Sequence, residues 1–348
     1  MLKRLFAAAA CASLALAAAS AQASDLNGAG ATFPAPVYAK WAELYKHQTG
    51  IGLNYQAIGS GGGIKQIEAK TVDFGASDKP LKPEKLQQDG LFQFPTVVGG
   101  VVPVMNLPGI QAGQVKLTGS LLAQIYLGDI KKWNDPQIAA YNHGINLPNL
   151  PITVVHRSDG SGTSFLFTSY LAMKNGKWAQ KVGASDSVAW PTGLGGKGND
   201  GVAAFTKQTI GAIGYVEYAY AKQNHMDYAL MQNKDGKFVT PDANNFAAAA
   251  GHGDWSTAPG FYLLLLDQPG AASWPITGAT FILVYKQQPN AQTGASVLKF
   301  YDWAYKNGDP AAVQLDYVPL PNPVKSMIRK AWADNVKGAD GKAVYVSK

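Results

Sequence analysis

The ten residues from His156 to Phe165, HRSDGSGTSF, combine one arginine, one aspartate, two glycines and four hydroxyl side chains. They follow the β-branched run TVV and lead into the apolar run LFTSYLA, a pattern that predicts a strand, a turn and a helix. The unpaired amides of a first helical turn attract anions, and Arg157 at the strand end adds a charged, two-pronged donor. The segment therefore predicts an anion site, although an ordinary helix cap beside a surface arginine would give the same pattern.

Individual groups in this turn suit such a site. Gly162 leaves room for the close approach of a ligand, and the hydroxyls of Ser161 and Thr163 lie beside the free amides of the helix start. Asp159 is placed to hold the Arg157 guanidinium in one orientation.

Two other helix starts present a hydroxyl and bare backbone in the same way. Thr32 precedes a predicted helix with Pro34 and Pro36 in its first turn, where a missing amide proton costs little. Ser60 and three glycines precede another helix in IGSGGGIKQIEA. We expect the three helix starts to converge on one small oxyanion.

Asp78, in DFGASDKPL, is unexpected beside an anion because its carboxylate repels negative charge unless the anion carries a proton. Phosphate keeps a proton near neutral pH and sulfate does not, so Asp78 in the site would select phosphate. A turn or helix cap before Lys79 and Pro80 is the alternative interpretation of Asp78.

The first residues, MLKRLFAAAACASLALAAASAQAS, have the pattern of a signal peptide over residues 1–23, with cleavage expected before Ser24. The only cysteine, Cys11, lies within it, so a mature chain of 325 residues would have no thiol for disulfides, thiolate metal sites or catalysis. Cys11 as a lipid-attachment site is the alternative, but AAAC lacks the large aliphatic residue that such sites prefer.

The charge of the chain excludes one class of partner. Without Lys3 and Arg4 the chain has 28 basic and 23 acidic residues, a net charge of +5 that is spread along the sequence. The longest local basic cluster is Lys131-Lys132, which is too short for a nucleic-acid tract. No later apolar run approaches the ~20 residues that cross a bilayer, so we expect a soluble protein and no nucleic-acid partner.

The order of strand-like and helix-like segments predicts an α/β protein of two domains. The β-rich run Leu91–Asn106, interrupted by prolines and glycines, predicts a first crossing between the domains, and Ser273–Lys286 predicts a return. Helices are expected over residues 296–307, ending at Gly308, and over residues 322–336.

Seven motifs together resemble the periplasmic phosphate-binding proteins of ABC-type phosphate importers: GAGATFPAPVYAKW, GSGGGIKQI, VDFGASD, FQFPTVVGGVV, DGSGTSF, WPTGLGGKGNDGVAAF and GAIGYVEYAYAKQN. The resemblance implies a type II periplasmic-binding-protein fold of two lobes, each a mixed sheet flanked by helices, that closes on one inorganic phosphate in the cleft. The predicted crossings place lobe I at residues 24–104 plus 275–348 and lobe II at residues 105–274. The resemblance further implies a periplasmic monomer without metal, cofactor or catalysis that delivers phosphate to the membrane permease subunits of the importer.

The resemblance also assigns the phosphate contacts and one supporting residue. The contacts are Thr32, Phe33 through its backbone amide, Ser60, Asp78, Arg157, Ser161, Gly162 and Thr163, and Asp159 is the partner of Arg157. Gly61 and His156 depart from the family pattern, which has a second serine and another basic residue there. The apolar segment 256–273 is expected to form a buried helix or, alternatively, a patch that faces a partner.

Other classes of function compete with this interpretation. Gly193–Gly198, GLGGKG, fits a dinucleotide motif with Glu217 about twenty residues on, but AWPT is a poor strand before it. Ser161 with His156 suggests a serine hydrolase, yet the G-x-S-x-G elbow is absent from the sequence. A secreted phosphatase remains the enzyme alternative and arsenate an alternative ligand, whereas a scaffold protein would need repeats or an apolar stripe that the sequence lacks.

Overall fold

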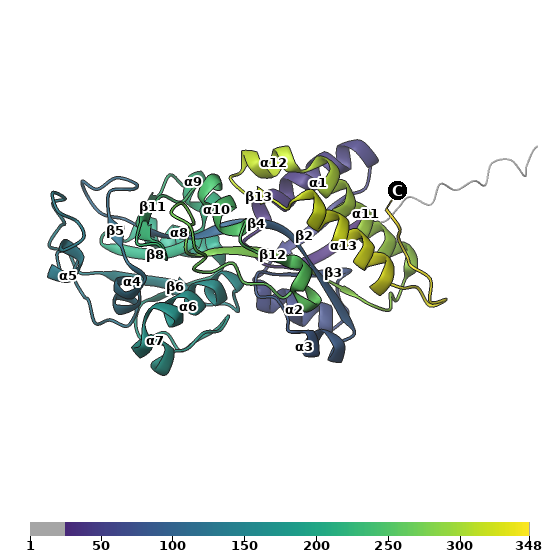
Figure 1. Ribbon diagram of the computed structural model, residues 1–348, viewed down its shortest axis with the longest axis horizontal. Coiled ribbons are helices and arrows are strands. Elements are labelled where there is room, and N and C mark those ends of the chain that lie inside the picture. The colour runs from purple at the N-terminus through teal and green to yellow at the C-terminus, as the bar shows by residue number, and fades with distance from the viewer. Residues whose placement is uncertain (1–24, 348) are drawn as a thin grey trace, which may run out of the picture.

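The computed structural model describes residues 25–347, so the predicted signal peptide lies outside the described residues. Among those residues no helix is both long and apolar enough to cross a bilayer. The elements form two groups, shown on the right and left of Figure 1, which we call group A and group B.

Group A contains the strands β1 (Leu26–Gly30), β2 (Leu53–Ala57), β3 (Phe74–Ser77), β12 (Thr277–Tyr285) and β13 (Val318–Pro319), and the helices α1 (Ala35–Thr49), α2 (Ser60–Glu68), α3 (Pro83–Gln88), α11 (Ala291–Asn307), α12 (Asp309–Gln314) and α13 (Asn322–Asn335). β1 pairs in parallel with β2 and β3, and β12 is antiparallel to β3. The helices expected near residues 296–307 and 322–336 are confirmed as α11 and α13.

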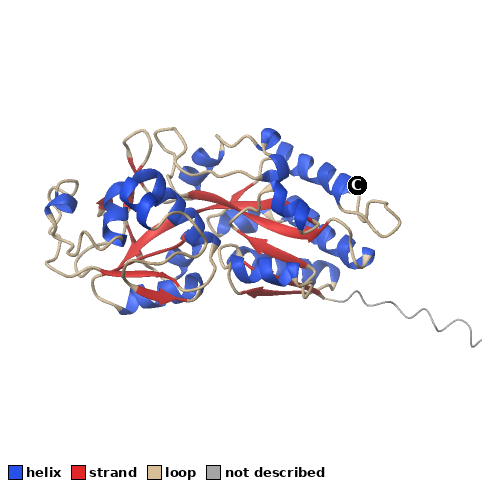
Figure 2. Cartoon of the chain, turned by 90° about the horizontal axis from the view of Figure 1, so that it is seen from below, coloured by secondary structure: helices blue, strands red, loops and turns tan. Residues whose placement is uncertain are grey.

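Group B contains the strands β6 (Thr153–Arg157), β7 (Leu194–Gly196), β8 (Ala212–Glu217) and β9 (Asp227–Tyr228), the small sheet of β5 (Lys116–Leu117), β10 (Leu230–Gln232) and β11 (Phe238–Val239), and the helices α4 (Gly119–Tyr126), α5 (Pro136–Ala139), α6 (Gly162–Lys174), α7 (Gly176–Lys181), α8 (Gly198–Gln208), α9 (Tyr218–Gln223) and α10 (Ala243–Ala250). β6 is parallel to both β7 and β8. Helices flank the strands in both groups (Figure 2), which confirms the predicted α/β class.

One long strand, β4 (Leu91–Met105), belongs to both groups. Its residues up to Gly100 pair with β12, and its residues from Val101 onward pair with β8, so the strand changes partner between two adjacent residues. The chain returns to group A through the segment before β12, where the indole of Trp274 donates to the carbonyl of Val101 at 3.0 Å. The sequence expectation for the two crossings covers Leu91–Asn106 and Ser273–Lys286, and the bounds of the two lobes stay a prediction.

Aromatic side chains form the core between the helices and the sheet of group A. The ring of Tyr301 on α11 lies 5.5 Å from that of Phe74 and 5.6 Å from that of Phe94, and the ring of Trp332 on α13 lies 5.1 Å from Phe94. All four side chains are fully buried. Burial of a large apolar side chain stabilises a fold by about 1.5–3 kcal/mol, so these contacts hold α11 and α13 against the strands.

The helix expected within residues 256–273 is wrong. The segment has two single 3-10 turns, Trp255–Thr257 and Pro259–Phe261, followed by irregular chain. Its large side chains are nevertheless partly or fully buried, and the ring of Phe261 packs edge-on against Phe92. A short apolar run has no periodicity long enough to distinguish a helix from a covering loop.

Candidate anion-binding site

The three predicted helix starts lie together in the structure. Pro34, Gly59 and Ser161 are the residues immediately before α1, α2 and α6. The start of α2 touches the turn before α6 because the amide of Gly61 donates to the carbonyl of Gly160 at 2.9 Å. Groups A and B therefore meet at the ends of helices, where free amides and the helix dipole favour negative charge.

All predicted contact residues are buried at this meeting point. The exposed fractions are at most 3% for Thr32, Phe33, Ser60, Asp78, Arg157, Ser161 and Thr163, and Gly162 is also buried. Gly162 lies so close to the opposite group that a Cβ added there would be 2.5 Å from Ser60 Oγ and 2.7 Å from the amide nitrogen of Asp78. Only glycine allows this approach.

The hydroxyls of Ser60 and Ser161 each accept a hydrogen bond from the backbone. Ser60 Oγ accepts from the amide of Asp78 at 3.2 Å, and Ser161 Oγ accepts from the amide of Ser164 at 3.0 Å. A hydroxyl has one proton and two acceptor positions, so each serine retains its proton for a ligand.

The hydroxyls of Thr32 and Thr163 have the same polarity. The side-chain amide of Asn199, on α8, donates to Thr32 Oγ1 at 2.7 Å and to Thr163 Oγ1 at 3.4 Å. Four buried hydroxyls are thus acceptors toward the protein and can act as donors toward a bound molecule.

Arg157 is held by Asp159 and keeps one donor group unused. Its Nε and Nη2 donate to the two carboxylate oxygens of Asp159 at 2.8 and 2.5 Å, and the amide of Gly198 also donates to Asp159 at 3.1 Å. Burial alone raises the pKa of Asp159, but the bonds and charge of Arg157 outweigh it and hold the pKa below its usual value. Arg157 Nη1 is buried without a hydrogen-bond partner among the described residues.

Asp78 supplies the acceptor of the site. Its Oδ1 is buried and has no hydrogen-bond partner in the described part of the chain. Burial raises the pKa of Asp78 to about 7, while the hydroxyl of Thr280 and the charge of Arg157 act in the opposite direction. The arrangement can therefore bind a small molecule that accepts many hydrogen bonds and donates one.

Two tyrosines from different groups hold the turn at Thr32 and Phe33. Tyr220 on α9 donates to the carbonyl of Thr32 at 2.6 Å, and Tyr317, just before β13, donates to the carbonyl of Phe33 at 2.6 Å. The sequence interpretation missed both tyrosines and Asn199. Asn199 and Tyr220 lie within two of the motifs that carry the resemblance, GKGNDGV and GYVEYAYA, which is the one signal that could have identified them.

The structure does not have the geometry that a dinucleotide site at Glu217 or a serine-hydrolase pair of Ser161 and His156 requires. Glu217 is fully buried and its carboxyl group contacts the amide of Ala219 and the hydroxyl of Tyr317, so it is inaccessible to a ribose. His156 Nδ1 donates to the carbonyl of Arg157 at 3.0 Å, and its ring stacks on Trp190 at 4.7 Å. Within residues 25–347 no histidine forms a hydrogen bond with Ser161, so the serine-hydrolase pair is not assembled.

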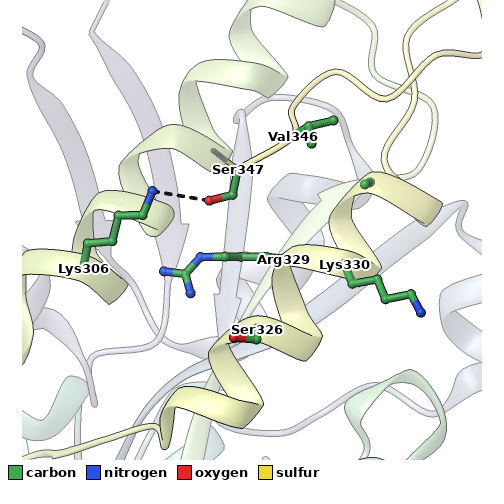
Figure 3. A pocket seen from close by; sticks show the side chains of 7 residues that line it. Lys306, Ser326, Arg329, Lys330, Val346 and Ser347 are labelled. Atoms are coloured by element: carbon green, nitrogen blue, oxygen red, sulfur yellow. Dashed lines mark hydrogen bonds between the residues drawn. The ribbon is translucent and has the colours of Figure 1, made fainter.

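A second basic region, near the C-terminal end of the described chain, has a different character. Lys306, Arg329, Lys330 and Ser347 line a surface cavity of about 360 Å³ (Figure 3). Asp302 accepts hydrogen bonds from Arg329 at 2.5 Å and from Lys306 at 2.8 Å. Because a carboxylate already neutralises these cations, the cavity is a poorer anion site than the buried cluster.

Comparison with protein families and with curated relatives shows the family of the chain. The family model described as a PBP superfamily domain matches residues 16–307. The chain is 55% identical over 324 residues to the phosphate-binding protein PstS of Pasteurella multocida, covering 93% of this chain and 94% of that protein. It is 36% identical over 319 residues to the protein of the same name from Methanocaldococcus jannaschii, covering 85% of this chain and 82% of that protein.

Solved structures have the same fold. A high-affinity periplasmic phosphate-binding protein (PfluDING), solved with phosphate bound, superposes with a TM-score of 0.74 at 23% identity over 92% of this chain and 97% of that one. An ABC-type phosphate transport receptor from Vibrio cholerae superposes with a TM-score of 0.55 at 20% identity, covering 85% of this chain and all of that one. The predicted type II periplasmic-binding-protein fold is confirmed.

Proposed function

The chain belongs to the family of phosphate-binding proteins within the PBP superfamily, and from this membership and the geometry of the site we propose that it binds inorganic phosphate in the periplasm and delivers it to an ABC-type membrane importer. The chemical contacts would be made by Thr32, Phe33, Ser60, Asp78, Arg157, Ser161, Gly162 and Thr163, with Asp159 holding Arg157. The permease subunits of the importer would be its partners, and the receptor would act as a monomer.

One observation carries the proposal: the buried cluster has several donors and a single carboxylate with an unpaired oxygen. Its four hydroxyls accept from the protein and retain their protons, and Arg157 Nη1 has no partner among the described residues. Asp78 Oδ1 is the unpaired acceptor. A phosphate that carries one proton satisfies both sets of groups at once, whereas sulfate has no proton for Asp78.

We further infer that the two groups of elements are lobes that close on the ligand, with lobe I at residues 24–104 plus 275–348 and lobe II at residues 105–274. Group A supplies Thr32, Ser60 and Asp78, and group B supplies Arg157 and the turn after it. Direct contacts across the site include the Gly61–Gly160 hydrogen bond and the ion pair of Lys79 with Asp186 at 2.8 Å. Closure would exclude water and strengthen each polar contact.

Binding without catalysis is part of the proposal. The relatives are named phosphate-binding proteins. The hydroxyl of Ser161 accepts a hydrogen bond from the backbone amide of Ser164 and so caps α6. The imidazole of His156 donates to the carbonyl of Arg157 and stacks on the ring of Trp190. We therefore expect no turnover of phosphate esters.

The experiment that tests the function is equilibrium dialysis of the ligand-stripped chain against labelled phosphate, with a parallel assay of ester hydrolysis. Arg157→Met removes a charged hydrogen bond worth about 1.5–3 kcal/mol, so its affinity should fall about 10- to 150-fold. Arg329→Met is the matched control because Arg329 also pairs with a buried carboxylate, that of Asp302, but lies outside the site. Equal affinity of Arg157→Met and Arg329→Met would contradict the assignment, and ester turnover by the wild type would contradict the binding role.

A further inference from the structure

Asn199 lies behind the site and contacts hydroxyls of both groups, although no contact with the ligand is assigned to it. We infer that Asn199 is the positioning residue that sets the hydrogen-bond polarity of Thr32 and Thr163, so that the Thr32 hydroxyl can only donate to the bound anion and the Thr163 hydroxyl is oriented as a donor toward it. This inference rests on the proposed binding of phosphate and adds a determinant of affinity to it.

The orientation of the Asn199 amide follows from an unambiguous donor. The backbone N–H of Glu217 points at Asn199 Oδ1 at 2.9 Å, and a backbone amide can only donate. The oxygen of the side chain must therefore face Glu217, and the NH₂ group must face the threonines. Since Asn199 is fully buried, water does not compete for these bonds.

Thr32 is constrained most strongly. Its Oγ1 accepts from Asn199 Nδ2 at 2.7 Å and from the backbone amide of Asn199 at 3.3 Å. These two bonds occupy both acceptor positions of the hydroxyl, and only its proton remains for another partner. Thr32 therefore cannot accept from a ligand O–H group, whereas the unpaired carboxylate oxygen of Asp78 can.

Thr163 receives the second proton of the same NH₂ group, at 3.4 Å. Thr32 belongs to group A, and Thr163 and Asn199 belong to group B, so a single amide connects one hydroxyl from each side of the cleft. The contact between groups A and B at this point and the orientation of the two threonine hydroxyls therefore depend on the same side chain, that of Asn199. The fixed dipoles cost no reorganisation when the anion binds, which favours tight binding.

The test compares two replacements by phosphate calorimetry. Asn199→Asp keeps the shape of the side chain but presents a carboxylate oxygen to the threonines, which would take their protons away from the ligand and add a negative charge. Asn199→Ala removes the two side-chain donors and the acceptor of the Glu217 amide, and it adds no charge. We expect the affinity to fall about tenfold for Asn199→Ala and about 100-fold or more for Asn199→Asp, although the aspartate is closer in shape.

A role in packing alone predicts the opposite order, because the isosteric aspartate would then be the milder change. If Asn199→Asp binds as well as or better than Asn199→Ala, the inference is overturned. Failure of the wild type to bind phosphate would instead overturn the proposed function. Asn142→Ala is the control, because Asn142 is another buried asparagine with three hydrogen bonds to the backbone, far from the site, and its loss should leave the affinity unchanged.

A second measurement covers the case in which Asn199→Asp does not fold. If Asn199 acts through the Thr32 hydroxyl, Asn199→Ala should cost less than about threefold in a Thr32→Val background, against about tenfold in the wild type. Additive losses in this double-mutant cycle would overturn the inference.

Discussion

Hydrogen-bond counting at single residues explains why the cluster suits an anion. The hydroxyls of Ser60 and Ser161 accept hydrogen bonds from backbone amides, and the hydroxyl of Thr32 accepts one from Asn199. These bonds do not use the hydroxyl protons, which can therefore be donated to a ligand. Among the described residues, Asp78 presents to the site a carboxylate oxygen that has no hydrogen-bond partner. The ligand that fits is an oxyanion that keeps one proton.

Replacement of Asp78 by asparagine should narrow the preference for phosphate over sulfate. The variant loses the negative charge that repels sulfate, and its NH₂ group can donate to a sulfate oxygen where the carboxylate can only accept. A site that requires a ligand hydroxyl can reject an analogue without one by roughly 10⁴, and this rejection should weaken. Competition binding with both anions measures the ratio of affinities. An unchanged ratio would contradict the role of Asp78. Asp135→Asn is the control, since Asp135 caps α5 away from the site and asparagine caps helices equally well.

Glu217 should make the stability of the protein depend on pH. The carboxyl group of Glu217 is fully buried, and its Oε2 accepts from the hydroxyl of Tyr317 at 2.9 Å, although the one proton of that hydroxyl is shared with the carbonyl of Phe33 at 2.6 Å. Burial, opposed by the bond with Tyr317, raises the pKa of Glu217 well above its usual value. A raised pKa of an acid stabilises the folded state at low pH, and this contribution is lost as the pH rises through the folded-state pKa.

Thermal unfolding of the wild type and Glu217→Gln between pH 5 and pH 9 tests this protonation. The glutamine cannot ionise, so its free energy of unfolding does not depend on this group. As the pH rises, the free energy of unfolding of the variant minus that of the wild type should increase by up to about 1.4 kcal/mol for each pH unit. Glutamine also places an NH₂ group where Glu217 Oε1 has no partner among the described residues, and an unsatisfied buried donor should lower its absolute stability at pH 5. A difference that does not change with pH would show that Glu217 is charged in the fold.

At the scale of elements, the starts of α1, α2 and α6 form the site, and local sequence was sufficient to predict them. Glycine, proline and hydroxyl residues at a helix start have a local cause, and Thr32, Ser60 and Ser161 lie where those patterns placed them. Asn199 could not be predicted because its function depends on the packing of α8 against two distant hydroxyls. The segment 256–273 was wrongly expected to be helical because its burial comes from neighbours such as Phe92 and not from its own periodicity.

Gly162→Ala tests the close approach of α6 to group A. The added methyl group would overlap Ser60 Oγ and the backbone of Asp78, and overpacking of this kind costs about 1–3 kcal/mol. Because these clashes cross the cleft, the affinity for phosphate should fall about 5- to 150-fold while the fold is retained. Calorimetry and circular dichroism separate the two effects. Gly176→Ala is the control, because Gly176 also begins a helix, α7, but an added Cβ there would have no atom within 4 Å. Equal affinities of the two variants would contradict the prediction.

For the whole molecule, one strand and one returning segment join two groups of elements whose contact surface contains the site. β4 changes partner at Gly100 and Val101, and β12 begins at Thr277. These places were predictable because prolines and glycines interrupt an otherwise β-rich run. The ion pair of Lys79 with Asp186 joins the two groups and is partly exposed, so we expect it to contribute little to the affinity.

The central claim is that the molecule closes on a protonated oxyanion. Calorimetric titration of the chain from Ser24 onward, stripped of ligand by unfolding and refolding, with phosphate and then sulfate, tests it most directly. We predict one-to-one phosphate binding with a Kd of about 1 μM or below and no detectable heat with sulfate. Equal binding of the two anions would contradict the selection by Asp78, and binding of neither would contradict the proposed receptor.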